Sequence, residues 1–311
     1  MTTPEPAPVF PVPGAGTAVP PRPSRVGDHL LYADATVSRL PGFRPLTLDL
    51  LRPADAAAQV PTVIWIHGGA WLEGSNKHFS PAIAPGRIDD RLLDAGFAVA
   101  LITYRFSGEA PFPAQLVDVK AAIRWLRHNA GELGLDPMRF AVWGESAGGH
   151  LASLACLTPG TRSPGSRDDE PDGSDAVQAG VVWYGPSNLL TMQAQSHPAA
   201  TIDHDHPQSP ESLLLGGPVP ARPDEARRAS PVNFVTPAAP PMLLVHGVED
   251  VLVPAAQSEE LYDALNAVGA DVALRLVPNA DHCFVGADLG PLVEDAVEFL
   301  RWSFSSPARR G

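Results

Sequence analysis

The chain has 311 residues, of which 44% are hydrophobic and 18% are charged. This balance is typical of a globular protein and too apolar for a disordered one. The formal net charge of -13 at pH 7 disfavours binding to nucleic acid or to any other polyanion. Two cysteines, Cys156 and Cys283, are too few for a disulfide framework, so we expect two free thiols.

Residues 1–25 are rich in proline. They lack the basic start and the unbroken apolar run of a secretory signal. Elsewhere no apolar run approaches the ~18 residues that a membrane-spanning helix needs. We therefore expect an extended or disordered N-terminal arm over residues 1–25, a single domain over residues 26–311, and a cytoplasmic location.

Short apolar runs alternate with amphipathic segments along the rest of the chain. Runs rich in Val, Ile and Leu are typical of strands covered on both faces, and we predict such strands at residues 46–51, 62–66, 98–103, 140–143, 180–184, 242–245 and 272–277. Apolar residues at helical spacing predict helices over residues 115–130, 254–268 and 288–304. The alternation predicts an α/β fold with a mostly parallel central sheet and helices on both faces.

Two stretches interrupt this alternation. Residues 163–175 are acidic and rich in Pro and Gly, which favours a solvated surface loop. Residues 188–233 have no strong period and are too long for a simple connection, which favours a small cap insertion over an active site.

The strongest chemical signal is Gly-Glu-Ser-Ala-Gly at residues 144–148, directly after a predicted strand and before an Ala/Leu-rich helix. A serine hydroxyl becomes a useful nucleophile only when it is exposed, close to a base and close to donors that stabilise an anion. A sharp strand-to-helix turn exposes the hydroxyl, and the helix N-terminus supplies free N–H groups. Ser146 is therefore the candidate nucleophile.

His-Gly-Gly-Ala-Trp at residues 67–71 follows another predicted strand. Adjacent glycines let backbone N–H groups approach a substrate oxygen closely, as in an oxyanion hole. We expect His67 to brace this loop rather than to act as the base.

A base and an acid follow two later strands. Asp250 comes after the strand at 242–245, and His282 comes after the strand at 272–277. Both are expected in loops at the carboxyl ends of neighbouring strands, where the acid would hold the base in the right tautomer. Glu249 and Asp281 are alternative acids.

With Ser146, Asp250 and His282 in that order, the sequence resembles the α/β-hydrolase superfamily, in the esterase/lipase branch related to hormone-sensitive lipase and bacterial feruloyl-esterase-like carboxylesterases. Two positions depart from the usual pattern of relatives. Ala70 stands where a third glycine is frequent, which puts the shape of the acyl pocket in doubt. Thr103 stands where an acidic residue often precedes Tyr-Arg, which puts the bracing of that loop in doubt.

The resemblance implies a serine carboxylesterase that acts on a small-molecule ester without metal or other cofactor. It assigns Ser146 as nucleophile, His282 as general base and then acid, and Asp250 as its orienting partner. The implied oxyanion donors are the backbone N–H groups of Gly69, Ala70 and Ala147. An aryl formamidase or other amidase with the same triad, a serine exopeptidase and a non-catalytic receptor are the alternatives.

Substrate contacts are less defined by the sequence. Trp71, Phe112, Trp183 and Tyr184 lie near predicted strand ends or loops, where they would line a cleft or belong to the core. The insertion is rich in Pro, Ser, Asp and His rather than in large apolar residues, which favours short-acyl or aromatic esters. Asp-His-Asp-His at 203–206 superficially resembles a metal cluster, but we expect a polar surface turn because neighbouring side chains point to opposite sides. A contribution to the substrate cleft is the alternative.

Overall fold

The computed structural model describes residues 19–40, 42–160 and 173–305. Most of the predicted N-terminal arm and most of the predicted acidic loop at 163–175 lie outside the described residues. Of the helices within these ranges, none has both the length and the apolar character needed to cross a membrane.

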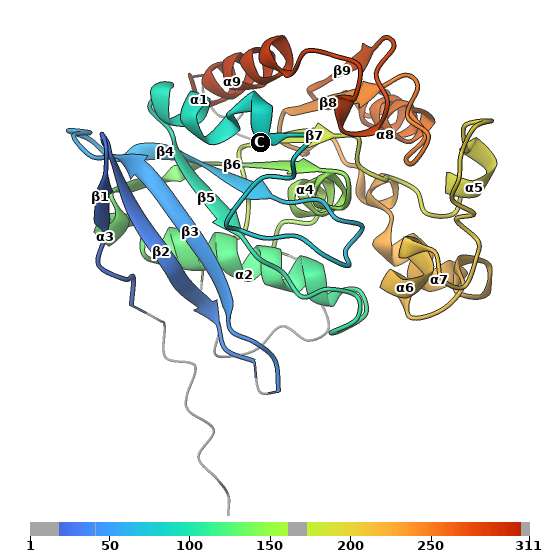
Figure 1. Cartoon of the computed structure of the whole chain (residues 1–311), viewed down its shortest axis with the longest axis horizontal. Coiled ribbons are helices and arrows are strands. Elements are labelled where there is room, and N and C mark those ends of the chain that lie inside the picture. The colour runs from blue at the N-terminus through green and yellow to red at the C-terminus, as the bar shows by residue number, and fades with distance from the viewer. Residues whose placement is uncertain (1–18, 41, 161–172, 306–311) are drawn as a thin grey trace, which may run out of the picture.

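The described strands form one nine-stranded sheet in the order β1-β2-β3-β5-β4-β6-β7-β8-β9 (Figure 1). Strands β4 to β9 pair in parallel, whereas β1, β2 and β3 pair in antiparallel fashion, with β3 against β5. The strand bounds are β1 Ser24–Val26, β2 His29–Ser38, β3 Leu46–Pro53, β4 Val60–Ile66, β5 Ala98–Ile102, β6 Leu135–Glu145, β7 Ala179–Trp183, β8 Met242–Gly247 and β9 Val272–Val277. This mixed, mostly parallel sheet confirms the predicted fold class.

All seven predicted strands are present, but β1 and β2 were not predicted. In β2 the register shifts between Tyr32 and Ala35, and Asp34 adopts a φ of 53°. Such an irregularity breaks the two-residue alternation by which a strand is recognised in a sequence.

Helices cover both faces of the sheet (Figure 1). On one face lie α2 (Ala114–His128), α3 (Ala130–Leu133), α4 (Ala147–Leu157) and α8 (Ala256–Ala267), and on the other lie α1 (Ile88–Asp94) and α9 (Leu289–Ser305). Alternate residues of β4 supply the two cores, since Ile64 packs with the α2 side and Val63 and Trp65 pack with the α9 side. The sheet is therefore packed on both faces, which holds the carboxyl ends of its parallel strands rigidly in place.

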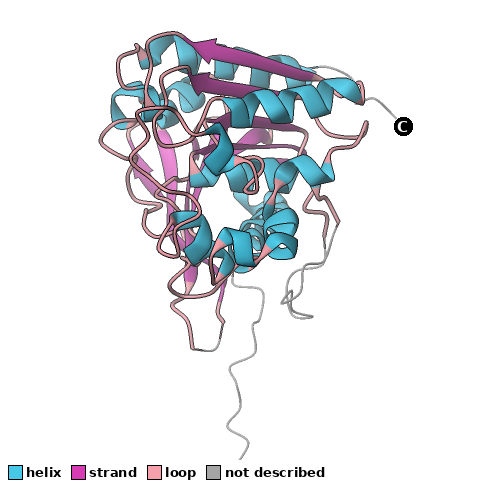
Figure 2. Cartoon of the chain, turned by 90° about the vertical axis from the view of Figure 1, so that its right-hand side faces the viewer, coloured by secondary structure: helices cyan, strands magenta, loops and turns pink. Residues whose placement is uncertain are grey.

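The chain between β7 and β8 carries short helices beside one end of the sheet, and this end faces the viewer in Figure 2. Their bounds are α5 Met192–Gln195, α6 Pro210–Leu215 and α7 Pro223–Ala229, and the short 3-10 helices are η1 Ala84–Gly86, η2 Val219–Ala221, η3 Pro231–Phe234 and η4 His282–Phe284. We call residues 188–233 the insertion.

A buried ion pair fastens the loop after β5 to α2. Two guanidinium nitrogens of Arg105 donate to the Asp118 carboxylate at 2.7 and 2.8 Å, and the backbone N–H of Arg105 donates to the same group at 2.8 Å. The side chains are 11% and 2% exposed. Breaking such a pair from one side is costly, because it leaves the other charge buried without a partner.

We expect Asp118→Asn to lower the free energy of unfolding by about 3 to 5 kcal/mol, since Arg105 would lose its counter-charge. Urea unfolding measures this loss. The control is Asp224→Asn, which removes the exposed pair of Asp224 with Arg227 and should change stability by less than about 1 kcal/mol. Equal, small losses in both variants would show that the buried pair contributes little.

Candidate active site

Ser146 lies on a tight turn between β6 and α4. Its backbone adopts φ 52° and ψ −121°, a strained conformation for a residue with a side chain. A Cβ atom on Gly148 would collide with the carbonyl oxygen of Ile66, and one on Gly144 would collide with the carbonyl of Gly148. Only glycine fits at these two positions, so the motif spacing reflects a real steric requirement of the turn.

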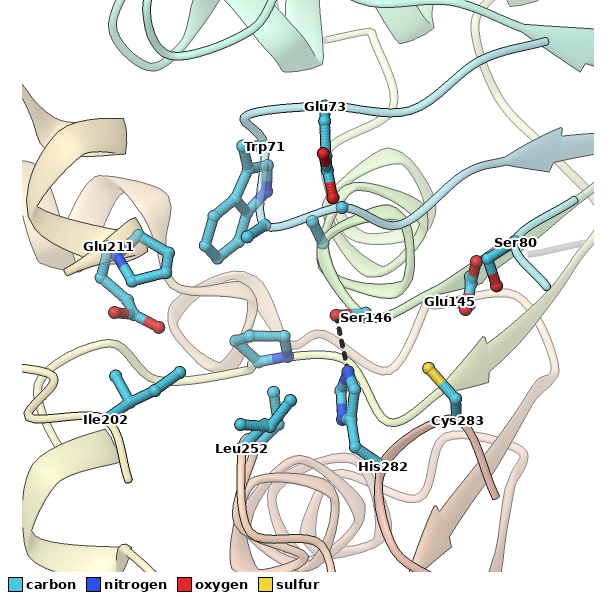
Figure 3. Close-up of a pocket in the computed structure, with 16 residues that line it drawn as sticks. Trp71, Glu73, Ser80, Glu145, Ser146, Ile202, Glu211, Leu252, His282 and Cys283 are labelled. Atoms are coloured by element: carbon cyan, nitrogen blue, oxygen red, sulfur yellow. Dashed lines mark hydrogen bonds between the residues drawn. The ribbon is translucent and has the colours of Figure 1, made fainter. Parts of the chain in front are cut away.

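A chain of hydrogen bonds connects Ser146, His282 and Asp250. The Ser146 Oγ lies 3.1 Å from His282 Nε2 (Figure 3). His282 Nδ1 lies 2.7 Å from Asp250 Oδ2. The alternative acids lie elsewhere. Asp281 accepts the backbone N–H groups of Val251 and His282, and the side chain of Glu249 is 56% exposed, with a carboxylate oxygen 3.8 Å from His197.

Asp250 is buried and held by several donors. Its Oδ1 accepts the backbone N–H groups of Leu252 at 2.9 Å and Val253 at 2.8 Å, and its Oδ2 lies 3.3 Å from Nε2 of the buried His246. Burial alone would raise the pKa of Asp250, but the hydrogen bonds from His246 and His282 outweigh burial and hold the pKa well below its usual range. The carboxylate therefore stays ionised beside His282.

His246 has no role that was predicted from the sequence. Its Nδ1 lies 2.7 Å from Ser258 Oγ and its Nε2 lies 2.8 Å from the Val253 carbonyl oxygen. A carbonyl only accepts, so the Nε2 carries the proton that also faces Asp250. The position of His246 at the end of a strand, four residues before Asp250, was the one available signal.

A second buried carboxylate, Glu145, lies next to the nucleophile. It accepts the Tyr184 hydroxyl at 2.8 Å, and burial raises its pKa. The Tyr184 ring also lies edge-on to the His282 ring, with centroids 4.8 Å apart. Tyr184 therefore packs against the ring of His282 and donates a hydrogen bond that fixes the Glu145 carboxylate beside Ser146.

The loop after β4 adopts a run of left-handed conformations, with φ of 103° at Gly69, 54° at Ala70 and 58° at Trp71. These residues border the same cavity as Ser146 and Ala147. Among the described residues, the N–H groups of Gly69, Ala70 and Ala147 have no backbone acceptor. The loop and the turn thus bring the three N–H groups that we expect at an oxyanion hole to the border of one cavity.

His150 fixes the Trp71 end of this loop. The Trp71 indole N–H donates to His150 Nδ1 at 3.2 Å, and His150 Nε2 lies 2.6 Å from the carbonyl oxygen of Ala229. Burial lowers the pKa of His150 to about 4, so the ring is neutral near pH 7, with its proton on Nε2. One imidazole thereby joins the loop after β4, the helix after the nucleophile and the insertion.

His67 lies buried at the start of the loop. Its Nδ1 lies 2.8 Å from the Gly68 carbonyl oxygen, and its ring stacks on Tyr104 with centroids 4.4 Å apart. Burial lowers the pKa of His67 to about 4. The side chain is far more suited to bracing the loop than to titrating during catalysis.

The cavity at Ser146 has a volume of about 290 Å³. Of the four aromatic residues expected near a cleft, Trp71 borders it and the other three do not. Trp183 is fully buried on the α9 face, where it packs on Trp143 and Phe284, because alternate strand residues point to opposite faces. Phe112 packs near His150, and the Tyr184 ring packs edge-on against the His282 ring.

The Asp-His-Asp-His segment forms a turn in which one of the four residues is buried. Asp203, Asp205 and His206 are exposed, whereas His204 is buried with its Nδ1 3.2 Å from Glu211 Oε1. Within the part of the chain that the structure describes, no group of three or more His, Cys, Asp or Glu side chains is placed to hold a metal ion.

Comparisons with known proteins agree with this architecture. The chain is 33% identical over 264 residues to the esterase LipQ of Mycobacterium tuberculosis, an alignment covering 83% of this chain and 59% of LipQ. It is 34% identical over 268 residues to the esterase LipC of the same organism, covering 84% of this chain and 63% of LipC. The chain thus spans about three fifths of the length of these curated relatives.

A solved structure described as a truncated form of a carbohydrate esterase from gut microbiota superposes with a TM-score of 0.74 at 30% sequence identity. The match covers 89% of this chain and 96% of that one. The family model BD-FAE matches residues 48–265. The chain therefore belongs to the BD-FAE family, in the esterase branch of the α/β-hydrolase superfamily, as its sequence resemblance predicted.

Proposed function

We propose that the chain is a serine carboxylesterase that hydrolyses short-acyl or aromatic esters through an acyl-enzyme. The observation that carries this proposal is the hydrogen-bonded series from Ser146 through His282 to Asp250, at 3.1 and 2.7 Å. Its relatives are named as esterases and a carbohydrate esterase, which supports ester hydrolysis.

In the first half of the reaction, His282 Nε2 takes the proton of Ser146 as Oγ attacks the ester carbonyl. The oxyanion of the tetrahedral intermediate accepts hydrogen bonds from the N–H groups of Gly69, Ala70 and Ala147. His282 then gives its proton to the departing alcohol, which leaves the acyl group on Ser146.

In the second half, His282 takes a proton from water, which attacks the acyl-enzyme carbonyl. The intermediate collapses when His282 returns the proton to Ser146 Oγ, and the carboxylic acid leaves. Throughout, the ionised Asp250 stabilises the imidazolium, and no step needs a metal or an organic cofactor.

The size of the cavity supports small substrates. Its volume of about 290 Å³ lies just below the ~300–1,000 Å³ range of ligand pockets. Ile202, Pro210 and Glu211 of the insertion border it. We therefore propose that residues 188–233 act as a cap that closes over a short acyl or aromatic group.

Ser146→Ala should lower kcat on p-nitrophenyl acetate by about 10⁴-fold or more, because the nucleophile is lost. A fluorophosphonate should label the wild-type chain at Ser146 and leave the variant unlabelled. A variant that retained most of its activity would disprove the assignment of the nucleophile.

Asp250→Asn should lower kcat by about 10⁴-fold with little change in KM, since the amide would no longer hold His282 in the productive tautomer. Glu249→Gln is the matched control, because this neighbouring carboxylate is exposed, and its kcat should stay near that of the wild type. The reverse pattern would make Glu249 the acid.

Initial rates on p-nitrophenyl esters from acetyl to dodecanoyl should peak at short chains, because the cavity holds only a small group. A peak at the longest chains would contradict the proposed substrate size. Absence of turnover on all of these esters, with Ser146 still labelled by a fluorophosphonate, would instead favour a formyl amide substrate.

A further inference from the structure

The cavity extends to two sides of Ser146 (Figure 3). On one side lie Glu145, Ser80 and Cys283, close to the base. On the other side lie Trp71, Ile202, Leu252 and Glu211. We call this second side the insertion arm, because Ile202 and Glu211 belong to the insertion.

Glu211 is an unusual residue for the wall of an otherwise apolar arm. The residue is 3% exposed, and its only hydrogen-bonding partner among the described residues is His204, whose Nδ1 lies 3.2 Å from Oε1. Its other carboxylate oxygen, Oε2, is buried without a partner, and Figure 3 shows the carboxylate turned toward the cavity.

Buried polar atoms are almost always hydrogen-bonded, so an exception at a cavity wall calls for an explanation. His204 is itself 2% exposed and its Nε2 also has no partner. Glu211 and His204 therefore hold each other in place, although each keeps one polar atom without a hydrogen-bonding partner. The vacant acceptor capacity belongs to a carboxylate whose residue borders the space that a substrate would occupy.

We propose that Glu211 Oε2 accepts a hydrogen bond from a hydroxyl group of the substrate, and that this enzyme prefers esters bearing a hydroxyl away from the scissile bond. The inference rests on the proposed esterase function and names a substrate class for it. Glu211 is a specificity-determining residue in this account and takes no part in the bond-breaking steps.

The charges of the lining residues support an uncharged donor. Three carboxylates border the cavity, from Glu73, Glu145 and Glu211, and no Lys or Arg is among its described lining residues. An anionic substituent would therefore be repelled. An ammonium group carries three donors, whereas a hydroxyl supplies one donor for one vacant acceptor.

The first test compares esters that differ in a single group. On the alcohol side, the series is butyl acetate, 4-hydroxybutyl acetate and 4-methoxybutyl acetate. The end of the butyl chain then carries no polar group, a hydroxyl that can donate, or a methoxy oxygen that can only accept. Methyl hexanoate, methyl 6-hydroxyhexanoate and methyl 6-aminohexanoate test the acyl side and the ammonium. We expect kcat/KM to be about 10- to 100-fold higher for the hydroxyl ester of at least one series, mainly through KM.

The second test uses variants. Glu211→Leu removes the acceptor at similar size and should abolish the hydroxyl preference. Glu211→Gln keeps an acceptor oxygen and should retain most of it. Glu225→Gln is the matched control, since Glu225 is a partly exposed carboxylate of α7, paired with Arg228 outside the cavity, and its preference should equal that of the wild type.

The outcomes separate clearly. Equal rates for the hydroxyl, methoxy and unsubstituted esters in the wild type would overturn the proposal, even if every Glu211 variant failed to fold. A preference confined to the amino ester would overturn it too, in favour of a cationic substrate. Turnover of p-nitrophenyl acetate and labelling of Ser146 report separately on the esterase function, so its failure would be distinguishable.

Discussion

The close approach of two backbones at Gly148 determines the geometry of the whole site. The first turn of α4 lies so near the carbonyl of Ile66 that no side chain fits between them. Since β4 and β6 are adjacent parallel strands, their carboxyl ends deliver the loop at 67–71 and the turn at Ser146 to one place. Any side chain at Gly148 would push the nucleophile away from the N–H groups that face it.

The pKa values of the two buried carboxylates near the nucleophile are shifted in opposite directions. Asp250 receives hydrogen bonds from His246, His282 and two backbone N–H groups, and these keep its pKa low despite burial. Burial dominates at Glu145 and raises its pKa, although the Tyr184 hydroxyl donates to it. The ionised Asp250 is thus held against Nδ1 of His282, where it can stabilise an imidazolium.

The fold and the candidate residues could be predicted from the sequence. The signals were the glycine motifs and the order of Ser146, Asp250 and His282. The glycine motifs are visible in the sequence because the steric needs of a strand-to-helix turn are local. Asp250 was already preferred over Glu249 and Asp281 from the sequence, and in the structure its carboxylate contacts His282 Nδ1. Trp183 was misleading, since the face on which a strand-end residue lies depends on register. His204 and Glu211 were beyond prediction as a pair, because they meet only through the irregular path of the insertion.

His150 joins three segments through one neutral ring, accepting from Trp71 and donating to the carbonyl of Ala229. The last residue of α7 is therefore part of the support of the loop that faces the nucleophile. For protein engineering, this means that the insertion is not an interchangeable module. A transplanted cap, however well it suits a new substrate, would have to present a carbonyl oxygen where Ala229 does, or the Trp71 end of the loop would lose its anchor.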